Sequence, residues 1–130
     1  MSSRDIRLEL DPKVSIAPQS IGGVVNGTGV DLSGCEAALI LLNSGAATTA
    51  ATVTIQESSD NATWTAVADT DLIGTTLNSA GVLQTASAIA KVSYIGVQRY
   101  VRVITTAGTA ALFSAEVVRG KQRHAGGVPV

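Results

Sequence analysis

The sequence from Lys91 to Val103 reads KVSYIGVQRYVRV and decides the fold, because two β-type runs meet in it. We expect one strand over Lys91–Val97 and a second over Tyr100–Thr106. Gly96 lies near the connection, where a bulge or a positive φ would turn the chain. The stretch is therefore interpreted as a hairpin whose register Gly96 maintains.

The second run alternates in polarity, which is typical of a half-buried strand. Alternation puts Val101 and Val103 on one face and Tyr100 and Arg102 on the other. A face that carries a ring beside a guanidinium suits contact with a partner. Arg99 and Arg102 are therefore candidate interface residues, and the alternative is that each is an ordinary solvated strand residue.

Several further strands are expected on both sides of this stretch. Ala37–Leu42 is a continuous apolar run, which favours a central strand buried on both faces. Thr52–Glu57 alternates, and Ser58–Asn61 after it has the side-chain oxygens that bond free backbone amides in a turn, so a hairpin follows. Trp64 opens the next strand and is expected to cap the core. Ala111–Val118 closes the series.

The start and the middle of the chain carry weaker signals. An alternating run ends at Asp11-Pro12, which predicts a strand or arm before that point. Asn26-Gly27 is a tight-turn signal. The segment 69–90 has no sustained period, and we expect loops with short strands there.

Composition fits one all-β domain. The chain has 130 residues, enough for a single core, and 45% of them are hydrophobic but only 3% aromatic. Short strands at close spacing, with no amphipathic helix, predict a single-domain β-sandwich of jelly-roll type. We expect an N-terminal arm over about residues 1–12 and a flexible C-terminal tail over about residues 120–130.

The net charge and the cysteine content limit the classes of partner and the cellular compartment that we expect. The formal net charge of -1 and the lack of a basic stripe argue against nucleic acid as a partner. One cysteine, Cys35, allows no internal disulfide and is expected to be a buried small hydrophobe. The longest apolar run is too short to span a bilayer and no secretory signal is seen, so we expect no membrane partner and assembly in a reducing cytoplasm.

Catalytic and metal-binding patterns are not found in the sequence. The sole histidine, His124, lies in the tail, which makes a histidine-based triad improbable. One histidine and Cys35 cannot close a zinc site. Calcium at Asp69 and Asp71, or at Asp60-Asn61, lacks the spacing of an EF-hand, and solvated turn acids are the favoured reading. We therefore predict a protein that is not an enzyme and has no cofactor, no metal and no small-molecule substrate.

Three pieces of the chain together resemble small structural proteins encoded in the head gene region of tailed bacteriophages. They are Val53–Asn61 followed by Trp64, then Tyr94-Ile95-Gly96, then Arg99–Val103. The resemblance covers roughly residues 37–118 and is a structural pattern, not a catalytic signature. It implies a β-sandwich subunit of a virion that decorates or cements the capsid shell, or completes the junction between head and tail.

The resemblance implies the major capsid protein and further copies of this chain as partners, and the virion as the location. A head-completion or tail component is the alternative within this class, and a carbohydrate-binding β-sandwich that stacks sugars on Trp64, Tyr94 and Tyr100 is the alternative from another class. Extended termini can reach across subunit boundaries. The candidate interface residues are Arg4, Arg7, Arg99, Tyr100, Arg102, Lys121 and Arg123.

Overall fold

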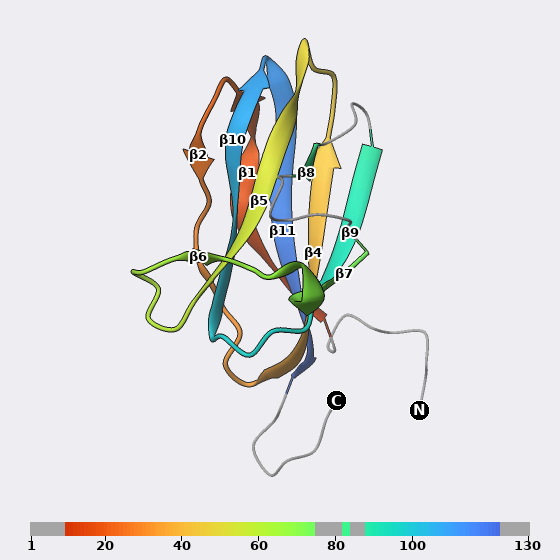
Figure 1. The fold of residues 1–130 in the computed structure, drawn as a ribbon. Helices are drawn as coiled ribbons and strands as arrows, with labels where there is room; N and C mark the ends of the chain where they lie inside the picture. The colour runs from red at the N-terminus through yellow and green to blue at the C-terminus, as the bar shows by residue number, and fades with distance from the viewer. Residues whose placement is uncertain (1–9, 75–81, 84–87, 123–130) are drawn as a thin grey trace, which may run out of the picture.

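The computed structural model describes residues 10–74, 82–83 and 88–122, which form a β-sandwich (Figure 1). Among these residues no helix is long and apolar enough to cross a membrane. The elements are β1 (Leu10–Ile21), β2 (Val25–Asn26), β3 (Val30–Asp31), β4 (Cys35–Ser44), β5 (Thr49–Ser58), β6 (Thr65–Ala66), the 3-10 turn η1 (Asp69–Asp71), β7 (Leu72–Ile73), β8 (Val82–Leu83), β9 (Ala88–Tyr94), β10 (Tyr100–Thr109) and β11 (Ala111–Gln122).

The strands form two antiparallel sheets. A five-stranded sheet has the order β1-β11-β4-β9-β7. A six-stranded sheet has the order β2-β10-β5-β6, with β3 also on β10 and β8 also on β5. If β2 with β3, and β6 with β8, are each taken as one interrupted edge strand, the two sheets have the strand order of a jelly roll, with β7 added at one edge. The predicted all-β sandwich of jelly-roll type is confirmed.

The core between the sheets consists mainly of aliphatic side chains. Val53 and Ile55 of β5, and Val101 and Val103 of β10, are fully buried, as their alternation predicted. Phe113 supplies a ring from the five-stranded sheet. Because few large rings are available, the sheets are held together by many small and branched side chains that pack closely.

β4 is the central strand of its sheet, as predicted, but it is not buried on both faces. Ile40 and Leu42 point into the core and are fully buried, whereas Leu39 and Leu41 alternate with them and are only partly buried. No second layer of described residues covers that outer face. The continuous apolar run in the sequence therefore gives no sign that buried and partly exposed residues alternate along this strand.

β1 begins at Leu10, so residues 10–12 of the predicted arm belong to a strand. The strand continues through Asp11-Pro12 and through Pro18, because β1 is an edge strand and a proline there does not have to donate to a neighbour. The register shifts between Val14 and Ile16 and again between Ile16 and Gln19, so Pro18 lies in an irregular part of the ladder. Residues 1–9 of the predicted arm lie outside the described residues.

The predicted hairpin between the last two runs is wrong. β9 pairs with β4 and β7 in one sheet, whereas β10 pairs with β5 in the other, so the connection crosses between the sheets. Gly96 has no positive φ. A Cβ there would come within 2.6 Å of the ring of Tyr94, so the backbone needs glycine for a close approach instead.

The other turn predictions had mixed outcomes. The hairpin after β5 is confirmed, because β6 pairs with the end of β5. Asn26-Gly27 does not form a hairpin turn, since β2 before it and β3 after it both pair with β10. The segment 69–90 contains the short elements η1, β7 and β8 and the start of β9. β11 extends to Gln122, and residues 123–130 of the predicted tail lie outside the described residues.

Candidate interaction surface

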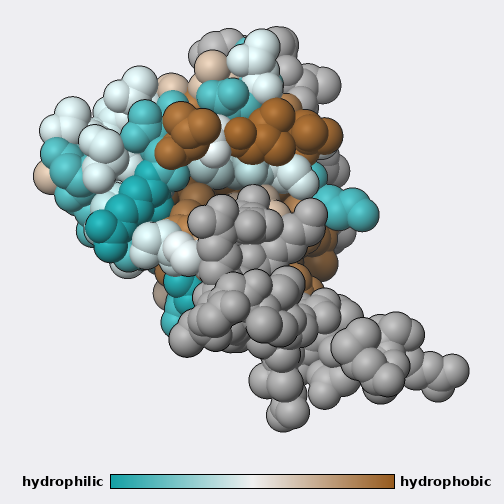
Figure 2. Space-filling view, turned by 90° about the horizontal axis from the view of Figure 1, so that it is seen from below, coloured by the Kyte–Doolittle hydropathy of each residue, from teal (hydrophilic) through white to brown (hydrophobic). Residues whose placement is uncertain are grey.

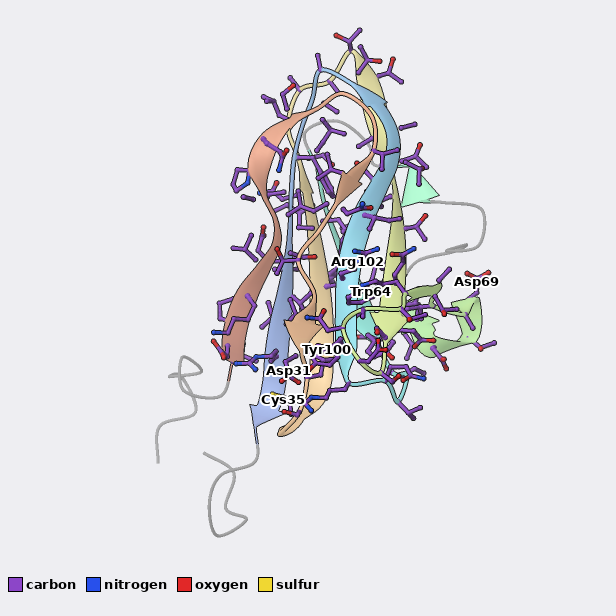
Figure 3. All side chains as sticks on the ribbon, turned by 90° about the vertical axis from the view of Figure 1, so that its left-hand side faces the viewer. Asp31, Cys35, Trp64, Asp69, Tyr100 and Arg102 are labelled. Atoms are coloured by element: carbon purple, nitrogen blue, oxygen red, sulfur yellow. The ribbon has the colours of Figure 1, made fainter. Side chains whose placement is uncertain are left out.

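Of the predicted interface residues, Arg99, Tyr100 and Arg102 can be placed. Tyr100 and Arg102 lie at the start of β10 and point away from the core, as the alternation predicted, and Arg99 immediately precedes the strand. Figure 3 shows Arg102 beside Trp64, with Tyr100 and then Asp31 nearer the end of the sandwich. The other predicted residues lie outside the described residues, as Arg4, Arg7 and Arg123 do, or have an undescribed side chain, as Lys121 does.

Arg102 and Trp64 form a stacked pair on the outside of the six-stranded sheet. The guanidinium carbon of Arg102 lies 4.4 Å from the centre of the indole ring, within the range of a cation-π contact. Arg102 Nε donates to Gln56 Oε1 at 2.9 Å, from the neighbouring strand β5. Partial burial lowers the pKa of Arg102. Among the described residues, no carboxylate forms an ion pair with this guanidinium.

Trp64 therefore does not cap the core, which corrects the expectation from sequence. The indole is partly exposed and packs on the backbone of Gly29, where an added Cβ would lie within 2.9 Å of two ring atoms and would overlap Asn61 Oδ1. We call Gly29, Gln56, Asn61, Trp64 and Arg102 the Trp64 cluster. It joins the β2–β3 connection, β5, the loop after β5, and β10 on one outer surface.

The loop that carries Trp64 is held by its own side chains, as the sequence predicted. Ser58 Oγ accepts from the backbone amides of Asp60 and Asn61 at 3.2 and 2.9 Å. Asp60 Oδ1 accepts from the amides of Ala62 and Thr63 at 2.9 Å each, which lowers the pKa of that carboxyl. Asn61 has a φ of 61°, which asparagine tolerates better than most residues. The turn thus fixes where the indole lies.

Arg99 has a carboxylate partner that the sequence did not reveal. Its Nε and Nη2 donate to the two oxygens of Asp31 at 3.0 and 2.9 Å, a bidentate pair between the start of β10 and β3. The Arg99 guanidinium lowers the pKa of Asp31 to about 2, with help from the Ser33 amide. Arg99 also lies 5.1 Å from the ring centre of Tyr100. Half of the Arg99 side chain remains exposed.

Arg119 extends this polar group to the five-stranded sheet. Its Nη1 donates to the carbonyl oxygen of Asp31 at 3.1 Å, and its Nη2 forms an ion pair with Asp11 of β1. Asp31 therefore accepts hydrogen bonds through its carboxylate from Arg99, just before β10, and through its carbonyl oxygen from Arg119 of β11. Charged groups thus connect β1, β3 and β11 at this end of the sandwich.

Tyr94 links the two sheets near the same end. Its hydroxyl donates to Glu57 Oε1 of β5 at 2.7 Å and accepts from the backbone amide of Gln98 at 3.1 Å. Burial, together with the hydrogen bond to Glu57, raises the pKa of Tyr94 above its usual value. This contact explains why the chain after β9 runs so close to the ring that Gly96 is required.

The β9–β10 connection exposes two aliphatic side chains next to these polar groups. Ile95 is 53% exposed and Val97 is 95% exposed. The Ile95 amide donates to the carbonyl oxygen of Asp71 at 2.8 Å, which anchors the connection on η1. Figure 2 looks onto this end of the molecule, where apolar surface lies beside hydrophilic surface. Sequence reasoning did not single out Val97, since one valine in an apolar run gives no sign of its exposure.

Other features of the described residues offer little for catalysis. No three His, Cys, Asp or Glu side chains gather there as they would around a metal ion. Cys35 is a partly buried free thiol whose pKa is raised by burial. An open pocket has no titratable side chain among its lining residues, which are Pro18, Gln19, Asn43, Gly45, Leu112, Phe113 and Ser114.

Comparison with known proteins gave no match: neither a family model, nor a curated protein, nor a solved structure is similar to this chain at a significant level. The geometry described above is therefore the basis for any functional assignment.

Proposed function

We propose that this chain is a structural subunit of a tailed-bacteriophage virion, assembled in the host cytoplasm, that decorates or cements the outer capsid shell. It would act by binding across capsomer boundaries and resisting the outward pressure of packaged DNA. Its partners would be the major capsid protein and other copies of itself, with no substrate turned over.

One observation carries the proposal: the three pieces of sequence behind the resemblance contact one another in the fold. Arg102 from the third piece stacks on Trp64 and bonds Gln56 from the first. Tyr94 from the second piece bonds Glu57 from the first. Segments far apart in the chain thus form one continuous body at one end of the sandwich, which supports the proposal that they act together as one contact surface.

The surface of this body has the chemistry of a contact site. Partly buried aromatic rings and arginines are enriched in protein interfaces, and here they are already held in one geometry by Gln56 and Asp31. Val97 adds exposed apolar area beside them. A virion offers the same site many times, so modest affinity at each site is enough for stable attachment.

Copy number in purified particles tests the proposal and separates its two versions. The particles would be those assembled from the genes that neighbour this chain's gene, and the copies would be counted by quantitative mass spectrometry. Hundreds of copies per particle are expected for a decoration protein, whereas about a dozen or fewer would indicate head completion or the tail. Absence of the chain from every particle would overturn the virion assignment.

A pair of valine variants tests the proposed surface. Val97→Asp is expected to lower binding to particles by at least about tenfold, because an exposed apolar contact becomes charged. Val24→Asp is the control, since Val24 is 69% exposed on the β1–β2 connection at the opposite end of the sandwich (Figure 1). Both variants are expected to unfold in urea at the wild-type midpoint. Equal particle binding by the two variants would place the contact elsewhere.

The carbohydrate-binding alternative is not favoured by a specific observation. Tyr94 is 5% exposed and cannot stack on a sugar. One face of the Trp64 indole is covered by Arg102, and Arg99 lies over the ring of Tyr100. The rings that would form a sugar platform are therefore already in contact with groups of the chain itself.

A further inference from the structure

The outer face of the five-stranded sheet is an apolar surface that no described layer covers. Cross-strand register puts Pro12 of β1, Val118 of β11, Leu39 of β4 and Ile73 of β7 in one row across the sheet, with Ser93 of β9 completing it. Ile73 is 59% exposed. A sandwich usually carries polar residues on its outer faces, so a row of this kind marks a binding surface.

The next row carries two opposite charges on either side of a leucine. Glu116 of β11 and Lys91 of β9 both lie across from Leu41, one on each side, and Val14 of β1 extends the row beyond Glu116. Val14 is 54% exposed. Neither Glu116 nor Lys91 forms an ion pair with another described residue. β4, which carries Leu41, is the middle strand of the sheet.

We infer that this face binds a second copy of the chain about a two-fold axis parallel to β4. Such an axis keeps each row opposite the same row of the copy but exchanges the two sides of the sheet. Leu39 and Leu41 then face their own counterparts, and Glu116 of each copy faces Lys91 of the other. Pro12 likewise faces Ile73, so apolar residues meet at both margins.

The charges select this axis over the other in-plane choice. A two-fold axis perpendicular to the strands would keep β11 opposite β11, and an axis that runs along the row of Leu41 would bring Glu116 toward Glu116 and Lys91 toward Lys91. Like charges facing each other across an interface are unfavourable. Around Leu41, Glu116 and Lys91 are thus self-complementary about an axis parallel to β4 and not about an axis along their own row.

The size of the face agrees with a specific interface. β1, β11 and β4 over the length of Leu112–Gly120, together with the shorter β9 and the two-residue β7, span on the order of 600 Å² at about 3.4 Å per residue and about 4.8 Å between strands. Specific interfaces take about 600–1,000 Å² from each partner. The six-stranded sheet and the Trp64 cluster remain free on the other side, so a dimer could still present the proposed particle-binding surface.

Charge reversal tests the inference in solution with the full chain. Wild-type protein is expected to show a concentration-dependent dimer in sedimentation equilibrium. Glu116→Lys and Lys91→Glu alone are each expected to weaken association by at least about tenfold, because each creates two like-charge contacts per dimer. The double variant restores both pairs with reversed sign and is expected to associate like wild type. Thr65→Lys, which adds a cation on exposed β6, serves as the control.

A cysteine pair tests the axis itself. In a Cys35→Ser background, Leu41→Cys is expected to be cross-linked between copies by a short bismaleimide, whereas Thr65→Cys is not. Circular dichroism and urea midpoints of all variants ensure that a loss of association is not a loss of folding.

A wild-type chain that stays monomeric at every concentration would overturn the inference, as would single charge reversals that associate like wild type. If the chain is monomeric and Leu41→Asp lowers particle binding instead, the face contacts the shell and not a second copy. The inference deepens the proposed function, which names copies of this chain as partners, and its test needs only the isolated chain. A chain that fails to self-associate would not contradict the virion assignment. Absence of the chain from particles would not contradict the dimer.

Discussion

At the scale of single residues, several positions are fixed by contacts that no local pattern reveals. Gly29 and Asp31 are ordinary turn or strand residues in the sequence, but each meets a partner far along the chain, and Gly96 lies against the ring of Tyr94 because that ring is held on Glu57 of another strand. Alternation predicted that Arg102 points outward, because that depends only on its neighbours. It could not predict that Trp64 lies on Arg102 outside the sheet, because that depends on how two distant loops fold.

Gly29→Ala is expected to destabilise the protein by roughly 1–3 kcal/mol, because the new methyl group overlaps Asn61 and the Trp64 ring. Urea unfolding monitored by the fluorescence of Trp64 measures this loss in unfolding free energy. Gly22→Ala is the matched control, since nothing lies within 4 Å of its added Cβ, and its effect should stay within about 0.5 kcal/mol. Equal stability of the two variants would contradict the close packing of the indole on Gly29.

Asp31 gives a prediction about pH. Its pKa in the folded chain is about 2, below the unfolded value of about 3.9, so its contribution is present above pH 4 and is lost as the pH falls toward 2. The contribution is small, at most about 1 kcal/mol, because the pair is largely exposed. The difference in unfolding free energy between wild type and Asp31→Asn should shrink over this range. The titration of other carboxylates affects both proteins equally and cancels in this comparison. A stability difference that stays constant with pH would argue against the Asp31–Arg99 ion pair.

At the scale of elements, strands were predicted well and their partners were not. β5 and β10 have the predicted faces, and the turn after β5 uses the predicted side-chain oxygens. The choice of sheet for β9 and β10 escaped prediction, because two adjacent runs with a glycine between them fit a hairpin and a crossover equally well. β1 continues through its two prolines because an edge strand does not need a hydrogen bond from every backbone amide. The sequence alone does not distinguish an edge strand from a central one.

The edge strand β1 is tied to the opposite sheet through Ser15, at one of its register shifts. Ser15 Oγ accepts from the Val103 amide of β10 at 3.0 Å and donates to the Thr28 carbonyl oxygen at 3.0 Å. Ser15→Ala leaves a buried amide without an acceptor and is expected to cost about 1–3 kcal/mol. Thermal or urea unfolding measures this cost, with exposed Ser20→Ala of the same strand as the control. Equal midpoints for the two alanine variants would show that the link contributes nothing.

At the scale of the whole molecule, the two outer surfaces of the sandwich have different chemistry. The six-stranded sheet carries the Trp64 cluster and the Arg99–Asp31 pair, whereas the five-stranded sheet carries rows of aliphatic residues around Glu116 and Lys91. The class of fold followed from composition and strand spacing. The two surfaces could not be foreseen, since they depend on which strands become neighbours.

The central claim is that this jelly roll is a structural part of a virion, and cryo-electron microscopy of the particle assembled from the neighbouring genes tests it most directly. The expected map shows a two-sheet sandwich at repeated symmetric positions on the outside of the shell, with the Trp64 cluster and the β9–β10 connection turned toward the capsid protein. A map of the complete particle, from shell to tail, with no density for this chain would contradict the account.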